Sequence, residues 1–178
     1  MNPEIKTILY SEEDLSKAVS ELGKKLTSDY EGRELVLVAV LKGSVLFFAD
    51  LMRCINLPCT IDFMAASSYG SSTVSSGKLN IKKDISCDIK GKDVLIVEDI
   101  LDTGTTLSYL KDYLAQREPA SIKLCTLFDK PARRKKPITA DYSCFTIDDQ
   151  FIVGYGLDYD EKFRNLPYVG ILDPGYCK

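Results

Sequence analysis

The chain contains no histidine among its 178 residues, and its six cysteines include no Cys-x-x-Cys pair. Without histidine the protein cannot hold a Ser-His-Asp triad or a Cys-His nucleophile. It also lacks the residue that most often joins cysteine at a zinc site. We therefore interpret the cysteines as buried or unreactive thiols in a reducing compartment. Any chemistry must use carboxylates, Lys, Arg, Tyr, backbone amides or a hard cation.

The sequence also lacks signals for export, for membrane insertion and for binding to polyanions. No basic region followed by an apolar segment opens the chain, and no apolar run reaches the length of a membrane span. The formal net charge of -3 provides no general attraction to nucleic-acid phosphates. These absences predict a cytoplasmic protein with no nucleic acid and no membrane among its partners.

Two common nucleotide-binding patterns are missing as well. No Gly-x-x-x-x-Gly-Lys-Ser/Thr string occurs, which excludes a P-loop nucleoside triphosphatase. The Rossmann pattern Gly-x-Gly-x-x-Gly is incomplete, because Gly154 and Gly156 are not followed by the third glycine.

The apolar segments that are present are typical of an α/β protein. The length suits one domain, residues 1–178, and 45% hydrophobic with 28% charged residues is a globular composition. Strand-like runs alternate with amphipathic helical segments, which indicates a mainly parallel twisted sheet flanked by helices. The expected strands are 35–41, 60–69, 78–85, 94–99, 122–128, one starting at 151, and 168–172; the expected helices are 12–30, 44–55 and one starting near 104.

One segment, residues 94–107, combines a buried-looking strand with three acids. Glu98 and Asp99 follow Val, Leu, Ile and Val, and Asp102 comes three residues later. Burying a carboxylate among apolar residues is costly unless a cation or hydroxyl donors compensate. In a parallel sheet, ligands bind at the carboxyl ends of the strands. A metal or a sugar diol would supply the compensation here.

The residues after these acids read Asp102-Thr103-Gly104-Thr105-Thr106. If a helix starts near Gly104, its free amides and dipole attract an anion, and the threonine hydroxyls add donors. The turn is therefore interpreted as a phosphate cradle. The alternative is that Asp102 or Thr103 only caps the helix.

Together these residues resemble the signature of the type I phosphoribosyltransferases, specifically of the 6-oxopurine branch. The resemblance implies that Glu98 and Asp99 hold the ribose hydroxyls or the magnesium around them. It assigns the 5'-phosphate of 5-phosphoribosyl 1-pyrophosphate to the turn, and proton transfer at purine N7 to Asp102. Other branches carry Ala, Thr or Tyr at this last position. The residues of the phosphate turn are Thr103, Gly104, Thr105 and Thr106.

Two loops extend the resemblance toward the leaving group. Lys42 and Gly43 match the pyrophosphate loop, which the family bends through a cis peptide; outside this context they would be an ordinary turn. Ser68 and Tyr69 open a Ser/Gly-rich segment that resembles the mobile lid over the reaction centre, or is only a connection.

Further matches place the purine and the metal. Lys130 falls where the family reads the 6-oxo group, Phe151 where it stacks on the purine, and Ile152 where the backbone contacts the base. Asp158 matches a magnesium ligand on the pyrophosphate side and is also counted with the purine-binding residues, and Arg164 matches a pyrophosphate contact. Without the resemblance, these would be a core strand and a polar loop. The basic run 133–136 is interpreted as a solvated face or a subunit contact, without a catalytic role.

The resemblance implies a small hood formed by the terminal segments, beside the parallel sheet. It implies purine salvage: Mg2+-dependent transfer of the 5-phosphoribosyl group to 6-oxopurine bases, hypoxanthine and also guanine, by a homodimer or homotetramer. Two alternatives stay open. One is a nucleotide-sensing regulator of the same fold that binds nucleic acid, and the other is an enzyme that prefers xanthine.

Overall fold

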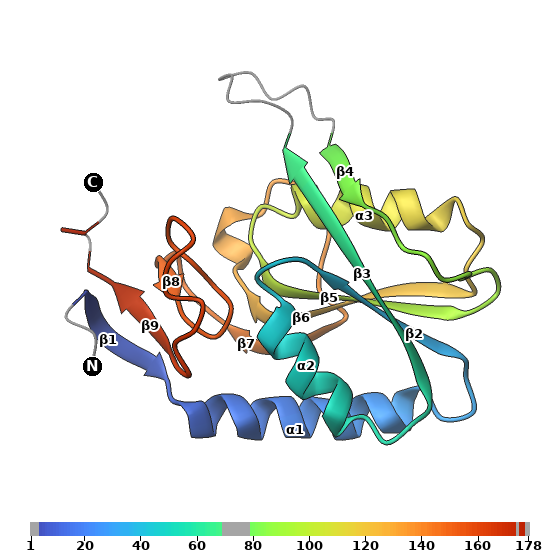
Figure 1. Ribbon diagram of the computed structural model, residues 1–178, viewed down its shortest axis with the longest axis horizontal. Helices are drawn as coiled ribbons and strands as arrows, with labels where there is room; N and C mark the ends of the chain where they lie inside the picture. Colours follow the sequence, from blue (N-terminus) through green and yellow to red (C-terminus); the bar gives the residue numbers. More distant parts are fainter. Residues whose placement is uncertain (1–3, 69–78, 174, 177–178) are drawn as a thin grey trace.

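The computed structural model describes residues 4–68, 79–173 and 175–176 of the chain (Figure 1). Its elements follow one another as β1 (Ile5–Tyr10), α1 (Glu12–Asp29), β2 (Leu35–Val40), α2 (Val45–Cys54), β3 (Cys59–Ser68), β4 (Leu79–Lys83), β5 (Asp93–Leu101), α3 (Thr105–Ala115), β6 (Ser121–Asp129), a 3-10 turn (Pro131–Arg133), β7 (Tyr142–Thr146), β8 (Ile152–Val153) and β9 (Val169–Leu172).

The larger sheet has the strand order β4-β3-β2-β5-β6-β7. All neighbouring pairs are parallel except β3 and β4. Every residue of β2 is buried, which explains its unbroken apolar run. The chain moves from β2 outward to β3 on one side, and from β5 outward to β6 and β7 on the other. The carboxyl ends of β2 and β5 therefore flank the point where the strand order reverses, the usual ligand crevice of an open α/β sheet.

Helices cover both faces of this sheet, as the sequence predicted. In Figure 1, α1 and α2 lie on one side of the sheet and α3 on the other. The alternation along β2 matches this arrangement: Leu35, Leu37 and Ala39 pack in the core with α1 and α2, whereas the intervening valines pack with α3. Among the helices of the described ranges, none has the length and apolarity that a membrane crossing requires.

A second sheet joins the two ends of the chain. Its antiparallel order is β1-β9-β8, and Figure 1 shows it beside the larger sheet with both termini. This is the predicted hood. The sequence did not predict β1 or β7. In β1 only Ile5 is buried, so no alternation marks the strand, and its partner β9 lies at the other end of the chain.

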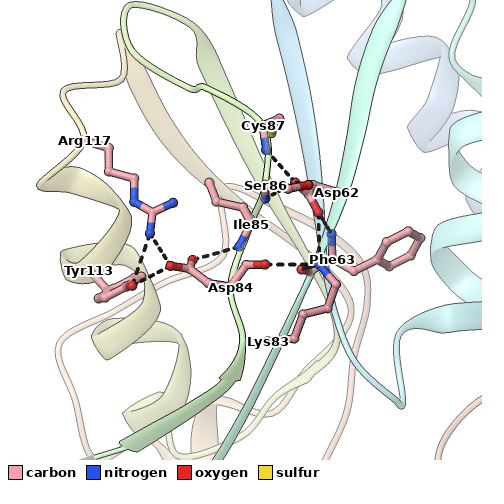
Figure 2. Close-up of polar contacts among 9 residues, drawn as sticks. All are labelled: Asp62, Phe63, Lys83, Asp84, Ile85, Ser86, Cys87, Tyr113 and Arg117. Atoms are coloured by element: carbon pink, nitrogen blue, oxygen red, sulfur yellow. Dashed lines mark hydrogen bonds and ion pairs between the residues drawn. The ribbon is translucent and has the colours of Figure 1, made fainter.

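The chain leaving β4 is fixed to the sheet and to α3 by two carboxylates (Figure 2). Asp62 of β3 is buried and accepts hydrogen bonds from the backbone amides of Ser86 and Cys87 at 2.6 and 2.9 Å. Asp84 accepts from the Tyr113 hydroxyl at 2.7 Å and pairs with Arg117. These contacts hold residues 84–87 in place after the strand pairing of β4 has ended.

Candidate active site

Glu98 and Asp99 lie inside β5, which continues to Leu101, and Asp102 follows the strand. The prediction that Glu98 and Asp99 close the strand was therefore wrong by two residues. The two carboxylates nevertheless have different neighbours. Asp99 faces Gly43, where an added Cβ would lie 1.7 Å from its Oδ2 atom. Glu98 instead lines a cavity of about 90 Å³ with Asp102, Thr103, Gly104 and Thr106.

Burial makes both carboxylates expensive to ionise. It raises the pKa of Glu98 well above its usual range, and the nearby Asp99 adds to the shift. It raises the pKa of Asp99 to about 6, although the Ile100 amide and Arg164 partly oppose the change. Glu98 Oε2 is buried and has no hydrogen-bond partner within the described chain. A cation or hydroxyl donors at this place would relieve these costs, so the residues fit the predicted ligands.

The protein's own side chains do not form a preassembled metal site among the described residues. Within residues 4–68, 79–173 and 175–176, no three His, Cys, Asp or Glu side chains are close enough to hold an ion. The predicted set of Glu98, Asp99 and Asp158 is therefore not a preassembled cage among these residues. Mg2+ commonly binds one or two carboxylates and completes its shell with water and substrate phosphates.

The turn after β5 has the form expected of an anion site. Gly104 adopts a left-handed φ of 78°, and α3 begins at the next residue without any side-chain cap. The capping alternative is therefore not what the structure shows. A weak contact of 3.4 Å joins the Thr105 amide to the Thr103 hydroxyl. The first amides of α3 remain available to an anion in the cavity that Gly104 and Thr106 line.

The carboxylate of Asp102 lies beside this turn without a hydrogen bond. Its Oδ1 atom is buried, and its nearest cation is Arg133, whose Nε lies 3.5 Å away. This separation allows charge attraction but is long for a hydrogen bond. The carboxylate is therefore held by charge attraction rather than by a hydrogen bond, and it borders the same cavity as Glu98.

The predicted pyrophosphate loop adjoins the acids at the end of β2. The Leu41–Lys42 peptide is cis, which confirms that expectation. Lys42 Nζ lies 3.0 Å from Glu161, and Arg164 lies 2.9 Å from Asp158 and 3.4 Å from Glu161. Gly156 packs its Cα against the Gly43 carbonyl, since an added Cβ would lie 2.0 Å from that oxygen. The two predicted pyrophosphate cations thus meet at one edge of the sheet.

The predicted purine residues occupy the neighbouring edge, at the end of β6. Lys130 is 5% exposed, and its Nζ contacts the Gln150 carbonyl at 2.9 Å and Asp149 at 2.7 Å. Phe151 is 50% exposed and meets Tyr159 edge to face at 5.6 Å. An exposed Phe is not the core residue that an isolated strand would place there. Ile152 is buried at the start of β8.

The predicted lid is only partly within the structure. Ser68 is the last residue of β3 and pairs with Leu79 of β4, beyond Met64, which pairs with the end of β2. Tyr69 lies outside the described residues.

Comparison with known proteins now agrees with this arrangement. The profile of a family described as phosphoribosyl transferase domain matches residues 7–160. The chain belongs to this family. A hypoxanthine-guanine phosphoribosyltransferase of Streptococcus thermophilus is 52% identical over 172 residues, 97% of this chain and 96% of the relative. One from Streptococcus agalactiae is 54% identical over 169 residues, 95% of this chain and 94% of the relative.

A solved structure extends the agreement to the fold of this phosphoribosyltransferase. The crystal structure of a hypoxanthine phosphoribosyltransferase from Staphylococcus aureus has a TM-score of 0.93 at 49% identity, covering 97% of this chain and 94% of that one. The predicted family and fold class are both confirmed. Phosphoribosyltransferases generally use a metal ion, which suits the buried acids of β5.

One residue in the basic run of this phosphoribosyltransferase departs from the solvated face that the sequence suggested, whereas Arg133, Lys135 and Lys136 are exposed. The Arg134 side chain is only 15% exposed, and its guanidinium donates to the Leu101 and Asp102 carbonyls. Arg133 approaches Asp102, as described above. Two of the four basic residues therefore belong to the site.

Sequence reasoning also missed three acids that pair with site cations. Glu161 contacts Lys42, Asp149 contacts Lys130, and Asp129 contacts Arg134. Each of these acids lies in a charged segment whose sequence is typical of a polar loop or of a strand end. Only their pairing in space separates them from ordinary surface acids.

Proposed function

We propose that the protein transfers the 5-phosphoribosyl group of 5-phosphoribosyl 1-pyrophosphate to hypoxanthine and guanine, forming IMP or GMP and pyrophosphate. The main support is that Asp102 lies between two parts of the site: the uncapped turn at the start of α3, and Lys130, the residue predicted to bind the 6-oxo group. Lys130 donates its backbone amide to Leu101, the residue before Asp102, at 3.0 Å. A base held by Lys130 would thus meet a sugar held by the turn. The relatives, which are hypoxanthine-guanine and hypoxanthine phosphoribosyltransferases, support the same substrates.

In the proposed reaction, purine N9 forms a bond to ribose C1 while the bond from C1 to the pyrophosphate oxygen breaks. The first amides of α3 and the threonines of the turn would hold the 5'-phosphate. Electron density leaves the purine ring as N9 bonds, which makes a proton on N7 more acidic. Asp102 would accept that proton as a general base.

The purine itself would be held by Lys130 and Phe151. Lys130 Nζ would donate a hydrogen bond to the 6-oxo oxygen of the purine and would give up its contact with the exposed Asp149 carboxylate. Phe151 offers an exposed ring face on which the base could stack, beside the Tyr159 edge. The backbone of Ile152 would contribute the remaining contacts.

Negative charge develops on the departing pyrophosphate, where Lys42, Arg164 and the amides around Gly43 would stabilise it. Asp99 and Asp158 would hold a divalent cation, Mg2+ in our proposal, which would supply further neutralisation of this charge. Glu98 would serve the ribose side, because it faces the cavity of the phosphate turn.

An ultraviolet assay tests the proposal directly. Each of hypoxanthine, guanine and xanthine is mixed with 5-phosphoribosyl 1-pyrophosphate, magnesium and the full chain, and then again with a chelator. We expect turnover of the first two bases and its loss with the chelator. No turnover of any 6-oxopurine would overturn the proposal, and preferential turnover of xanthine would change the substrate.

Asp102→Asn tests the role of the carboxylate. Loss of a general base reduces turnover by about 10² to 10⁴-fold. The KM for 5-phosphoribosyl 1-pyrophosphate should stay within about twofold, because Asn keeps the shape of the turn. Unchanged turnover would refute the assignment. Homodimeric or homotetrameric assembly and a cytoplasmic location remain predictions.

A further inference from the structure

Arg134 joins two strand ends of the site through a single guanidinium. Its NH2 group pairs with Asp129, the last residue of β6. Its NH1 group donates to the Leu101 carbonyl at 2.8 Å and to the Asp102 carbonyl. The first carbonyl belongs to Leu101, the last residue of β5. The second belongs to Asp102, the proposed general base, at the start of the phosphate turn. The side chain is 15% exposed, so these contacts are largely shielded from water.

The same segment holds the next carbonyl along the turn. Thr103 O accepts from the Lys135 and Lys136 amides at 2.9 and 3.3 Å, and Leu101 O also accepts from the Lys130 amide at 3.0 Å. Three consecutive carbonyls of the turn are thus bound by residues 130–136. The Cδ of Arg134 also lies 3.2 Å from where a Cβ on Gly104 would be.

These carbonyl contacts decide where the amides of the turn point. In a trans peptide the carbonyl and the following N–H point in opposite directions. Within the described residues the only cis peptide is Leu41–Lys42. With the Asp102 and Thr103 carbonyls held toward 130–136, the amides of Thr103 and Gly104 must point away from it. Both residues line the cavity next to Glu98.

We propose that Arg134 is a positioning residue of the transferase. It fixes the Asp102–Gly104 backbone so that the Asp102 carboxylate and the phosphate-binding amides of Thr103 and Gly104 face the same substrate. Asp129 neutralises its charge, which argues against a direct role as a phosphate ligand. The planar guanidinium reaches a carboxylate and two carbonyls at once, which a lysine ammonium on a flexible stem cannot reproduce. The inference rests on the proposed roles of Asp102 and of the turn.

The test compares Arg134→Lys and Arg134→Met with a matched control, Arg117→Met. Arg117 is also half-buried and paired with a carboxylate, Asp84, but lies in the anchor of β4 (Figure 2). All variants are assayed as full chains at a temperature where thermal unfolding shows them to be folded. Steady-state constants are measured separately for hypoxanthine and for 5-phosphoribosyl 1-pyrophosphate.

We expect both Arg134 variants to lower kcat at least about tenfold and to raise the KM for 5-phosphoribosyl 1-pyrophosphate at least about fivefold, in line with the effect of a small misplacement. The KM for hypoxanthine should stay within about twofold, because Lys130 and Phe151 are untouched. Arg117→Met should keep all three constants near wild type, even if its melting temperature falls.

The inference is overturned if Arg134→Lys has wild-type constants, or if the Arg134 variants change both KM values equally. If Arg134→Met does not fold, Arg134→Lys and Asp129→Asn decide, since each keeps part of the bridge and should show the same split in weaker form. Failure of the proposed function looks different: the wild-type chain itself would turn over no 6-oxopurine.

Discussion

Replacing Gly43 by alanine should place a methyl group inside the Asp99 carboxylate. The added Cβ would lie 1.7 Å from Oδ2 and 2.7 Å from Cγ. An ordinary contact needs about 3.5 Å, so the two groups must separate by roughly 1.5 to 2 Å. Neither side moves easily. Asp99 Oδ1 accepts from the Ile100 amide at 2.7 Å, and the Gly43 carbonyl packs against Gly156.

We therefore expect two effects of Gly43→Ala. Overpacking should lower the free energy of unfolding by about 1–3 kcal/mol. Displacing the buried carboxylate or the predicted pyrophosphate loop by more than 1 Å should lower kcat/KM by about 10²-fold or more. Urea denaturation measures the first effect, and initial rates with varied 5-phosphoribosyl 1-pyrophosphate measure the second.

A double-mutant cycle with Asp99→Ala isolates the cause. Asp99→Ala removes Cγ and both oxygens, so Gly43→Ala should cost much less stability in that background. The expected coupling energy is about 1–3 kcal/mol, well above the error of additive sites. An equal cost of Gly43→Ala in both backgrounds would refute the steric argument and place the strain elsewhere in the loop.

Two further predictions concern the purine platform and the β4 anchor. Phe151→Ala should raise the KM for hypoxanthine about 10 to 100-fold with little change for 5-phosphoribosyl 1-pyrophosphate, because one stacked base is worth about 1–3 kcal/mol; equal changes in both KM values would contradict a stacking role. Burial would raise the pKa of Asp62, but hydrogen bonds from Cys87, Phe63, Ser86 and Lys83 outweigh it and hold that pKa well below its ordinary 3.8. Asp62→Asn should therefore cost about 2–4 kcal/mol of unfolding free energy at pH 7. Urea denaturation should show this cost shrinking as the pH falls below about 4, because the stabilisation by ionised Asp62 is complete above its unfolded pKa and is lost as the pH falls toward its lower folded pKa; a cost that is constant from pH 7 to pH 3 would contradict this.

The sequence predicted those parts of the fold whose signal is local. The strand β2 is buried along its whole length, so its apolar run identifies it without knowledge of its neighbours. In contrast, β1 exposes Lys6, Thr7 and Ile8 and is a strand only because β9 pairs with it. That pairing joins positions more than 150 residues apart, which no window of sequence reports.

The same distinction applies to the candidate site. Two acids after an apolar run signal a buried carboxylate, and the fold places Glu98 and Asp99 in that setting. Arg134 gives no such signal. Its partners on β5 are backbone carbonyls about thirty residues earlier, and a carbonyl is present at every position. A basic run on the surface and one that binds the turn after β5 therefore look the same in sequence.

The predicted ligand-binding cations are paired with the protein's own acids. Lys42 pairs with Glu161, Arg164 with Asp158, and Lys130 with Asp149. A ligand must therefore offer these cations more than the carboxylates it displaces. The side chains of Lys42 and Glu161 are 67% and 64% exposed, so breaking their pair costs about 1 kcal/mol or less. A pyrophosphate with several charges can meet that cost at two cations at once, whereas a single carboxylate or chloride only exchanges one weak pair for another. The pairs thus favour polyphosphate ligands over the small anions of the cell before any contact with the sugar is made.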